Sequence, residues 1–204
     1  PDEVEKIGVG AFSSVAYLKT AVLPDKLTII SKKLFEQDYR LLDVTIPSSL
    51  QRIEESAFSQ CYGLKSVVLP EGLISIGNYA FWACGFYDGM STVYESSNFT
   101  SVTLPSTLQE IGEGAFGSCS VLKSINIPNN VTEIRGQTFN RCTRLEKVVL
   151  PSSIKVIKND AFLSCKALNT ITFSWNAPQM DSEVFSNVVT ATCYYPSNNS
   201  EWTS

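Results

Sequence analysis

The sequence contains no histidine and no long apolar run, and each absence excludes a class of protein. Without histidine, no Ser-His-Asp or Cys-His mechanism is possible, and the commonest zinc ligand is missing. No stretch approaches the roughly 18 apolar residues of a membrane-spanning helix. The formal charge of −4 gives no electrostatic case for binding nucleic acid. A carboxylate or lysine mechanism is not excluded by these absences.

What the sequence does contain is a 23-residue period. Prolines recur at this interval, with one interval of 35, at Pro1, Pro24, Pro47, Pro70, Pro105, Pro128 and Pro151. The same spacing, with the same 12 extra residues, separates Phe12, Phe35, Phe58, Phe81, Phe116, Phe139, Phe162 and Phe185. A fixed period of this length is the signature of a solenoid. The sequence therefore predicts eight coils over residues 1–196, a 12-residue insertion within about 85–98, and a polar tail at 197–204.

The segment 145–167 shows the plan of one coil. Val148 and Leu150 alternate with outward residues, which is the period of a strand, and Pro151 ends that strand because it cannot donate to a ladder. A second short extended piece follows. The spacing of Ala-Phe-x-x-Cys is one turn, with the phenylalanine and Cys165 pointing inward. Stacked coils then predict one long parallel sheet, short second extended pieces and short helical turns.

Three places depart from this plan. Asp38 occupies the cysteine position of the second coil, where a buried carboxylate is costly, so we expect a local distortion that lets it reach water or backbone N–H groups. Pro1 already stands at a repeat position, which suggests a piece of a longer protein. In the last coil, residues 190–196 resemble a strand shifted by one residue, with Cys193 and Tyr195 inward.

Across residues 1–196 the repeat reads roughly L-x-x-I-x-I-P-x-x-V-x-x-I-G-x-x-A-F-x-x-C and resembles the BspA-like leucine-rich repeat family. The resemblance implies a right-handed coil, shaped as a horseshoe or rod, that is secreted or displayed on a bacterial surface. Some members are described as adhesins that bind host matrix proteins or other bacteria. Asp38, the insertion and the last coil depart from the family pattern. Adhesion in the family has no motif to match residue by residue.

Five cysteines recur at the repeat spacing, at Cys61, Cys84, Cys119, Cys142 and Cys165. A metal or disulfide array is one interpretation. However, the spacing is not that of a zinc site, and five residues cannot all pair. The interpretation we favour is a column of small, buried thiols in the core. We predict no catalytic, metal-binding or cofactor-binding residue.

Two surfaces are candidate partner-binding sites. The first is the outward face of the sheet, whose Ser, Thr and Val columns suit an extended partner and include Thr45, Ser66, Val68, Ser101 and Thr103. The alternative is that these residues are strand formers chosen for the sheet. The second is the insertion, whose large side chains are typical of binding hot spots: Phe86, Tyr87, Met90 and Tyr94. The alternative there is a lid packed on the neighbouring coil.

These patterns predict a non-catalytic, monomeric binding module that is secreted or held at the cell surface. Its partner would be a protein or glycan, such as host matrix or another cell's surface. The alternative is a structural spacer that carries another domain of a longer surface protein. A carboxylate-based glycan hydrolase would need two acidic side chains facing each other across a groove, and the sequence offers no fixed pair.

Overall fold

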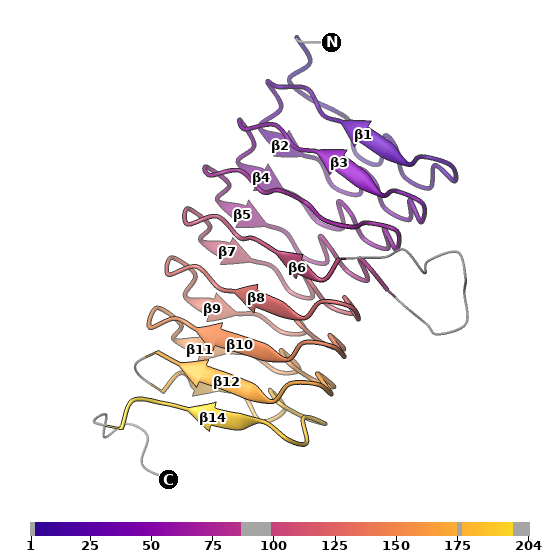
Figure 1. The fold of residues 1–204 in the computed structure, drawn as a ribbon. Helices are drawn as coiled ribbons and strands as arrows, with labels where there is room; N and C mark the ends of the chain where they lie inside the picture. Colours follow the sequence, from indigo (N-terminus) through magenta and orange to yellow (C-terminus); the bar gives the residue numbers. More distant parts are fainter. Residues whose placement is uncertain (1–2, 87–98, 175–176, 198–204) are drawn as a thin grey trace.

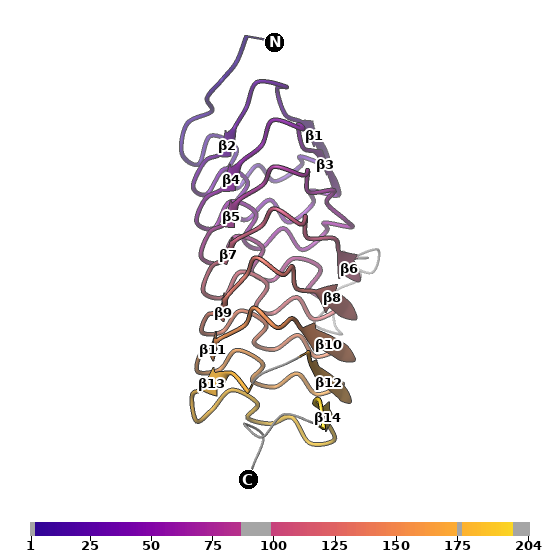
Figure 2. The ribbon, with the colours of Figure 1, turned by 90° about the vertical axis from the view of Figure 1, so that its left-hand side faces the viewer.

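The computed structural model describes residues 3–86, 99–174 and 177–197, and every structural statement below refers to these ranges. The chain winds into a stack of coils with two strand-bearing walls, shown in Figure 1 and, after a turn of 90°, in Figure 2. Eight rungs on the first wall bound seven full turns, so each predicted repeat contributes one rung.

The first wall is a parallel sheet with one rung per coil. Its strands are β1 (Thr20–Val22), β3 (Asp43–Thr45), β6 (Ser101–Val102), β8 (Ser124–Asn126), β10 (Lys147–Leu150), β12 (Thr170–Phe173) and β14 (Thr192–Tyr194). β1 pairs with β3, and the other five form a second ladder in the order β14-β12-β10-β8-β6. In the third coil the rung shrinks to isolated bridges, which join Ser66 to Asp43 and Val68 to Thr103. The long sheet predicted from the sequence is present, with its weakest hydrogen bonding at that coil.

The second wall consists of two-residue strands, as the predicted second extended pieces require. They are β2 (Ile29–Ile30), β4 (Arg52–Ile53), β5 (Ser75–Ile76), β7 (Glu110–Ile111), β9 (Glu133–Ile134), β11 (Val156–Ile157) and β13 (Gln179–Met180). All pair in parallel, in the orders β2-β4-β5-β7 and β13-β11-β9. The ladder of this wall is therefore interrupted between β7 and β9.

The third side of each coil is a series of single turns. Cys61 N–H donates to the carbonyl of Phe58 at 3.2 Å, so the predicted helical turn is one i, i+3 turn, and no described residue lies in a helix. For seven of the eight repeat phenylalanines, the residues two before and two after have positive φ, such as Ser56 at 57° and Gln60 at 62°; at Phe185 only Asn187 does. An α-helix of L-residues does not continue through that conformation.

The turns bond each coil to the next in one direction. In the second coil, the N–H groups of Lys33, Phe35 and Gln37 donate to third-coil carbonyls at 2.8–3.0 Å. Six of the seven junctions carry three such bonds, and the last carries two. On this side of the solenoid, N–H groups therefore point toward the following coil and carbonyl groups toward the preceding one.

The core between the walls is a ladder of stacked side chains. The eight repeat phenylalanines form one column with ring centroids 5.1–5.9 Å apart. Phe99, the first described residue after the insertion, is fully buried at a leucine position, 6.1 Å from the ring of Phe81. The period thus resumes at Phe99, as the sequence predicts, and the insertion does not interrupt the core.

Candidate functional site

The outward face of the first wall carries the sheet residues predicted to bind a partner. Within the stack, the strands from β3 to β12 alternate between the core and the outside. In β3, for example, Val44 is buried while Asp43 and Thr45 are exposed. All five predicted residues are exposed on this face: Thr45, Ser66, Val68, Ser101 and Thr103. Val68 and Thr103 lie side by side through the bridge between their coils. That these residues contact a partner remains a prediction.

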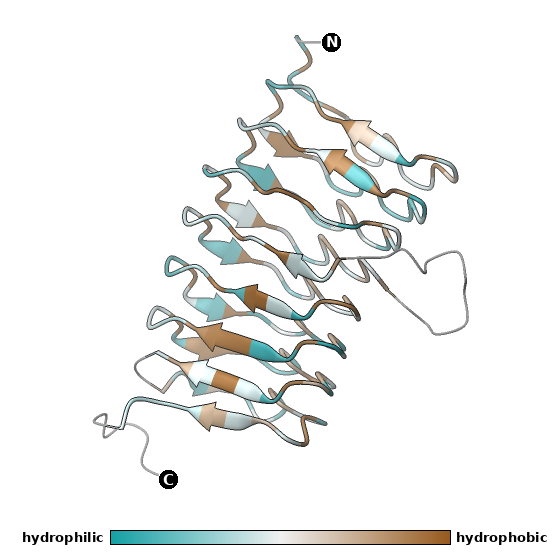
Figure 3. Ribbon diagram, in the orientation of Figure 1, coloured by the Kyte–Doolittle hydropathy of each residue, from teal (hydrophilic) through white to brown (hydrophobic). Residues whose placement is uncertain are grey.

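The chemistry of this face is mostly uncharged. Val22 and Val68 are 80% and 82% exposed, although valine is a side chain that folding usually buries. Charge enters mainly at Asp43 in β3 and Lys147 in β10, both exposed. Figure 3 shows hydrophobic and hydrophilic segments interleaved along these strands. The face therefore offers methyl groups and hydroxyls in rows rather than a charged patch.

The start of the insertion packs against the third coil. Phe86 is half-buried, its ring lies 5.7 Å from that of Tyr62, and its N–H donates to the carbonyl of Ala83 at 3.2 Å. The rings of Tyr62 and Tyr39 stack at 5.0 Å. The other predicted insertion residues, Tyr87, Met90 and Tyr94, lie outside the described residues.

The cysteine column is satisfied within the core. Each of the five thiols donates to the carbonyl of a phenylalanine in the preceding coil at 3.1–3.2 Å, as Cys61 does to Phe35. All five are buried and none is in a disulfide. Burial raises the pKa of every thiol in the column, to about 12 for Cys165. The arrangement is that of unreactive core thiols, since the thiolate is the reactive form.

The sixth cysteine differs from the sequence-based prediction. Cys193 pairs in register with Ile171, so the predicted shift of the last strand by one residue is present. Its side chain is exposed all the same, and so is Tyr195 at 52%, because β14 is the last described rung and no described coil covers it. An inward register position therefore does not guarantee burial at the end of a stack.

Thiol titration of the native protein is expected to separate these two kinds of cysteine. Cys193 should react with Ellman's reagent at once, while the five buried thiols react only as the chain opens. Unfolding in denaturant should release all six thiols. A native protein in which two or more thiols react at the rate of Cys193, or a mass that reveals two disulfides, would contradict the buried-column interpretation.

Asp38 interrupts the column of thiols, but the coils on either side of it remain stacked. It is fully buried, and its Oδ1 accepts a hydrogen bond from the N–H of Val15 at 2.6 Å, which confirms that it reaches backbone N–H. Its Oδ2 has no partner among the described residues. Burial raises the pKa of this carboxyl from 3.8 to about 6, and the bond from Val15 opposes that rise. An ionised carboxylate here is therefore destabilising.

Asp38→Cys should stabilise the protein, and more so at neutral than at acidic pH. Because the folded-state pKa is raised, the stability that comes from protonated Asp38 is complete below about pH 4 and is lost as the pH rises to about 6. A cysteine restores the column and stays neutral over this range. Urea denaturation of both proteins from pH 4 to 7 measures the difference in free energy of unfolding between the variant and the native chain. A gap that does not widen with pH would contradict an ionisable, buried Asp38.

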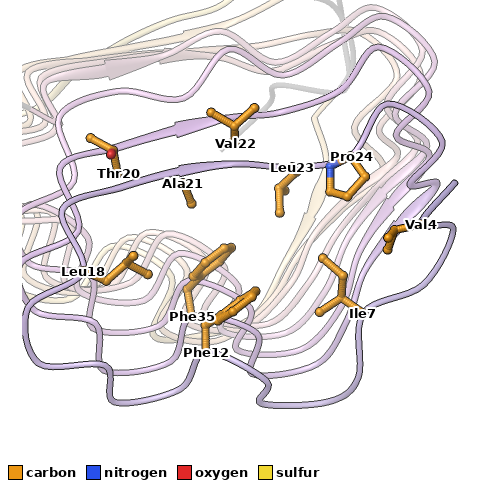
Figure 4. Close-up of a pocket in the computed structure, with 10 residues that line it drawn as sticks. All are labelled: Val4, Ile7, Phe12, Leu18, Thr20, Ala21, Val22, Leu23, Pro24 and Phe35. Atoms are coloured by element: carbon orange, nitrogen blue, oxygen red, sulfur yellow. The ribbon is translucent and has the colours of Figure 1, made fainter. Parts of the chain in front are cut away.

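The stack also has an apolar hollow and a polar hollow. An apolar one of about 410 Å³ opens at the N-terminal end of the stack, where Figure 4 shows Ile7, Phe12 and Leu18 pointing into it. A polar one of about 400 Å³ lies beside the break in the second wall and is lined by Gln109, Glu110, Asn130 and Thr132. Within residues 3–86, 99–174 and 177–197, no group of three His, Cys, Asp or Glu side chains could hold a metal ion.

Comparison with known families identifies the repeat. The profile of the BspA type leucine-rich repeat region, in six copies, matches residues 1–88 and 89–204. The chain belongs to the BspA-type leucine-rich repeat family. Members of this family are generally repeat proteins without catalytic activity. No helix in the described part of the chain is long and apolar enough to cross a membrane.

Solved structures of other bacterial leucine-rich repeat proteins have a similar fold. A protein from Bacteroides ovatus is 22% identical with a TM-score of 0.67, over 93% of this BspA-type chain and 58% of that one. A leucine-rich repeat protein of T. pallidum is 27% identical with a TM-score of 0.72, over 82% of this chain and 75% of that one. A leucine-rich cell surface protein of Faecalibacterium prausnitzii is 24% identical over 95% of this chain and 64% of that one, with a TM-score of 0.48. The chain thus spans 58% of the B. ovatus chain and 64% of the F. prausnitzii chain. No curated protein sequence matches.

Proposed function

We propose that this BspA-type chain is a non-catalytic binding module that is secreted or held at a bacterial surface. It binds a protein or glycan partner on the outward face of the first wall. The observation that carries the proposal is the pair of valines, Val22 and Val68, which are 80% and 82% exposed on a mostly uncharged sheet face. An apolar surface that the chain itself does not cover is typical of a contact site.

The repeat favours an extended partner over a compact one. Rungs of the first wall follow one another at about 4.8 Å, so each outward column is a straight row of similar groups. An extended peptide or a polysaccharide also repeats its groups along a line and can meet several rungs at once. The methyl groups would contact apolar faces of such a partner, while Ser66, Ser101 and Thr103 would exchange hydrogen bonds with it.

Paired substitutions on the two walls test the sheet face. Val68→Arg with Thr103→Arg places two long charged side chains on adjacent rungs of the proposed surface. Thr28→Arg with Thr132→Arg is the matched control, because both threonines are exposed beside strands of the second wall. Binding to a printed glycan array and to immobilised collagen should fall at least tenfold for the first pair only. Equal binding by all variants, or an equal loss in both pairs, would overturn the proposal.

The insertion is proposed as the edge of the same surface. It leaves the stack after Cys84 and returns at Phe99, immediately before β6 of the first wall. Replacing residues 87–97 with a short Gly-Ser linker keeps Phe86 and its contact with Tyr62. The melting temperature should stay the same after this replacement, while partner binding should fall. A collapse of stability would show that the insertion is a structural lid, and unchanged binding would restrict the proposed surface to the sheet face.

A further inference from the structure

Charge is distributed unevenly over the fifth, sixth and seventh coils. On the first wall and the turn that leads into it, residues 118–126, 141–149 and 164–172 contain a single carboxylate, Glu146. The same three segments, called the basic strip below, contain five exposed cations: Lys123, Arg141, Arg144, Lys147 and Lys166. The whole chain has a formal charge of −4, so an even placement would give this strip more acidic than basic side chains.

The other side of the same coils has the opposite balance. Residues 105–117, 128–140 and 151–163 form the second wall and the beginning of the turns, and they contain four carboxylates and three cations. The carboxylates are those of Glu110, Glu113, Glu133 and Asp160. Figure 2 shows the two walls on opposite sides of the stack. These coils are therefore positive along the first wall and slightly negative along the second.

Stacking brings the cations of the basic strip close to one another. Lys147 pairs in register with Ser124 of the coil before it and with Thr170 of the coil after it. Rungs of a sheet lie about 4.8 Å apart. The Debye length at physiological ionic strength is about 8 Å, so salt does not screen one rung from the next. The positive potentials of the three coils therefore overlap.

Four of these cations are not neutralised by a neighbour. Within the described part of the chain, Lys123, Arg141, Lys147 and Lys166 form no ion pair. The described ion pairs all lie in the first three coils, where they join Lys26 to Glu3, Lys32 to Glu55 and Lys33 to Glu36. Like charges held close together repel and disfavour the compact state. A negatively charged partner would remove that repulsion.

The surroundings of the basic strip favour a polysaccharide over other polyanions. In residues 99–174, which the structure describes throughout, no large hydrophobic side chain is exposed and every aromatic ring is buried. Single-stranded nucleic acid binds by stacking on aromatic rings as well as by charge. A membrane surface takes up apolar side chains beside the basic ones. What lies among the cations is a set of hydroxyl and amide groups, at Ser124, Asn126, Thr170 and Thr172.

We propose that the basic strip binds an acidic polysaccharide, whose sulfate or carboxylate groups repeat along the polymer. The polymer lies along the stack, so consecutive anionic groups meet cations of consecutive coils. Arg141 binds an anionic group through two N–H groups, and Lys147 acts as a point charge. Ser124 and Thr170, on either side of Lys147, exchange hydrogen bonds with sugar hydroxyls. This site goes beyond the sheet-face proposal, because charge carries it and the exposed valines do not.

Salt dependence is the first test of this site. Isothermal titration of the native chain with dextran sulfate should show binding that weakens steeply as NaCl is added, because binding releases the cations condensed on the polymer. Carboxymethyl dextran should behave in the same way. Neutral dextran has the same backbone without the charge and should not bind. Equal binding of neutral dextran and dextran sulfate, or no binding of either anionic polymer at low salt, would overturn the proposal.

Two pairs of substitutions then locate the site. Lys147→Gln with Lys166→Gln removes two charges from the basic strip. Lys155→Gln with Lys158→Gln is the matched control, because it removes the same charge from two exposed lysines of the second wall. The affinity for dextran sulfate should fall about tenfold in the first pair, with a shallower salt dependence, and stay native in the control. An equal loss in both pairs would show that net charge, and not the basic strip, attracts the polymer.

Two other polyanions test the class of partner. Poly(dT), and vesicles of equal parts phosphatidylcholine and phosphatidylglycerol, should both bind more weakly than dextran sulfate at the same concentration of negative charge. Binding of either one as tight as that of dextran sulfate would contradict a polysaccharide site. Val68→Arg with Thr103→Arg should still bind dextran sulfate, so this proposal and the sheet-face proposal can fail separately. Circular dichroism melts should show that every variant is folded at the temperature of the titration.

Discussion

Phe139→Ala should lower the free energy of unfolding by about 3–5 kcal/mol, the range for truncating a buried aromatic side chain. Phe139 is fully buried, with the ring of Phe116 at 5.9 Å on one side and that of Phe162 at 5.3 Å on the other. Coils on both sides hold these neighbours in place, so they cannot collapse into the cavity. Urea denaturation of the variant and the native chain measures the difference.

The same truncation at the end of the column is the control. Phe12 is 41% exposed and stacks on Phe35 alone, at 5.6 Å. Less apolar area leaves water when this ring is buried, so Phe12→Ala should cost clearly less than Phe139→Ala. Equal losses at the two positions would be incompatible with a stack of coils in which the first coil has one neighbour.

Gly112→Ala should be strongly destabilising for a change that adds a single methyl group. A Cβ at this position would lie 2.4 Å from both the nitrogen of Asn78 and the carbonyl carbon of Gly77. Both are backbone atoms of the preceding coil, so neither can rotate away as a side-chain tip could. Overpacking of this kind typically costs about 1–3 kcal/mol. Here it should also weaken the inter-coil bond from Gly112 N–H to the carbonyl of Ile76, now 2.8 Å long.

Gly8 occupies the same repeat position in the first coil and provides the matched control. A Cβ on Gly8 would meet nothing within 4 Å. Gly8→Ala should therefore leave the free energy of unfolding within about 0.5 kcal/mol of the native value. A comparable loss in Gly8→Ala and Gly112→Ala would show that the backbone conformation required at this repeat position, and not the close approach of two coils, sets the cost.

The sequence predicted the repeat because stacking forces each coil to place the same kind of side chain at the same depth. From this repetition the sequence predicted the two walls, the phenylalanine column, the buried thiols and the resumption of the period at Phe99. It also identified Asp38 as a carboxyl that must reach water or backbone N–H groups, and the structure supplies the N–H of Val15. Each of these features depends on the identity of a side chain, which is the information that a sequence states directly.

The turns were harder to predict, because their geometry depends on backbone conformation. Positive φ recurs at two positions in each of the first seven coils, yet glycine occupies the first of them only at Gly10 and Gly114, while Lys33 and Tyr79 adopt the same conformation. With no glycine column to signal it, the Ala-Phe-x-x-Cys spacing reads as part of a helix. The exposure of Cys193 escaped prediction for a related reason, since register along a strand does not show whether another coil follows.

The sheet-face residues illustrate a different limit. The alternation of each strand identifies which side chains point outward, and the structure places Thr45, Val68 and Thr103 there. Strand propensity and partner binding both favour Thr and Val on such a face, so composition alone cannot separate the two causes. Substitutions that add charge to one wall at a time can separate them.

The one-way bonding of the turns gives the solenoid an electrical polarity. In each of the first six coils, the three peptide units whose N–H groups bond the next coil point their dipoles of about 3.5 D along the stack, with the positive pole toward the C-terminal end. Dipoles in neighbouring rows point the same way, so their electric fields add. An α-helix has its positive pole at its first turn, so this wall carries the reverse field relative to the direction of the chain. The N-terminal end of the stack is therefore the negative pole of this dipole and favours a cation. The C-terminal end is the positive pole and favours an anion.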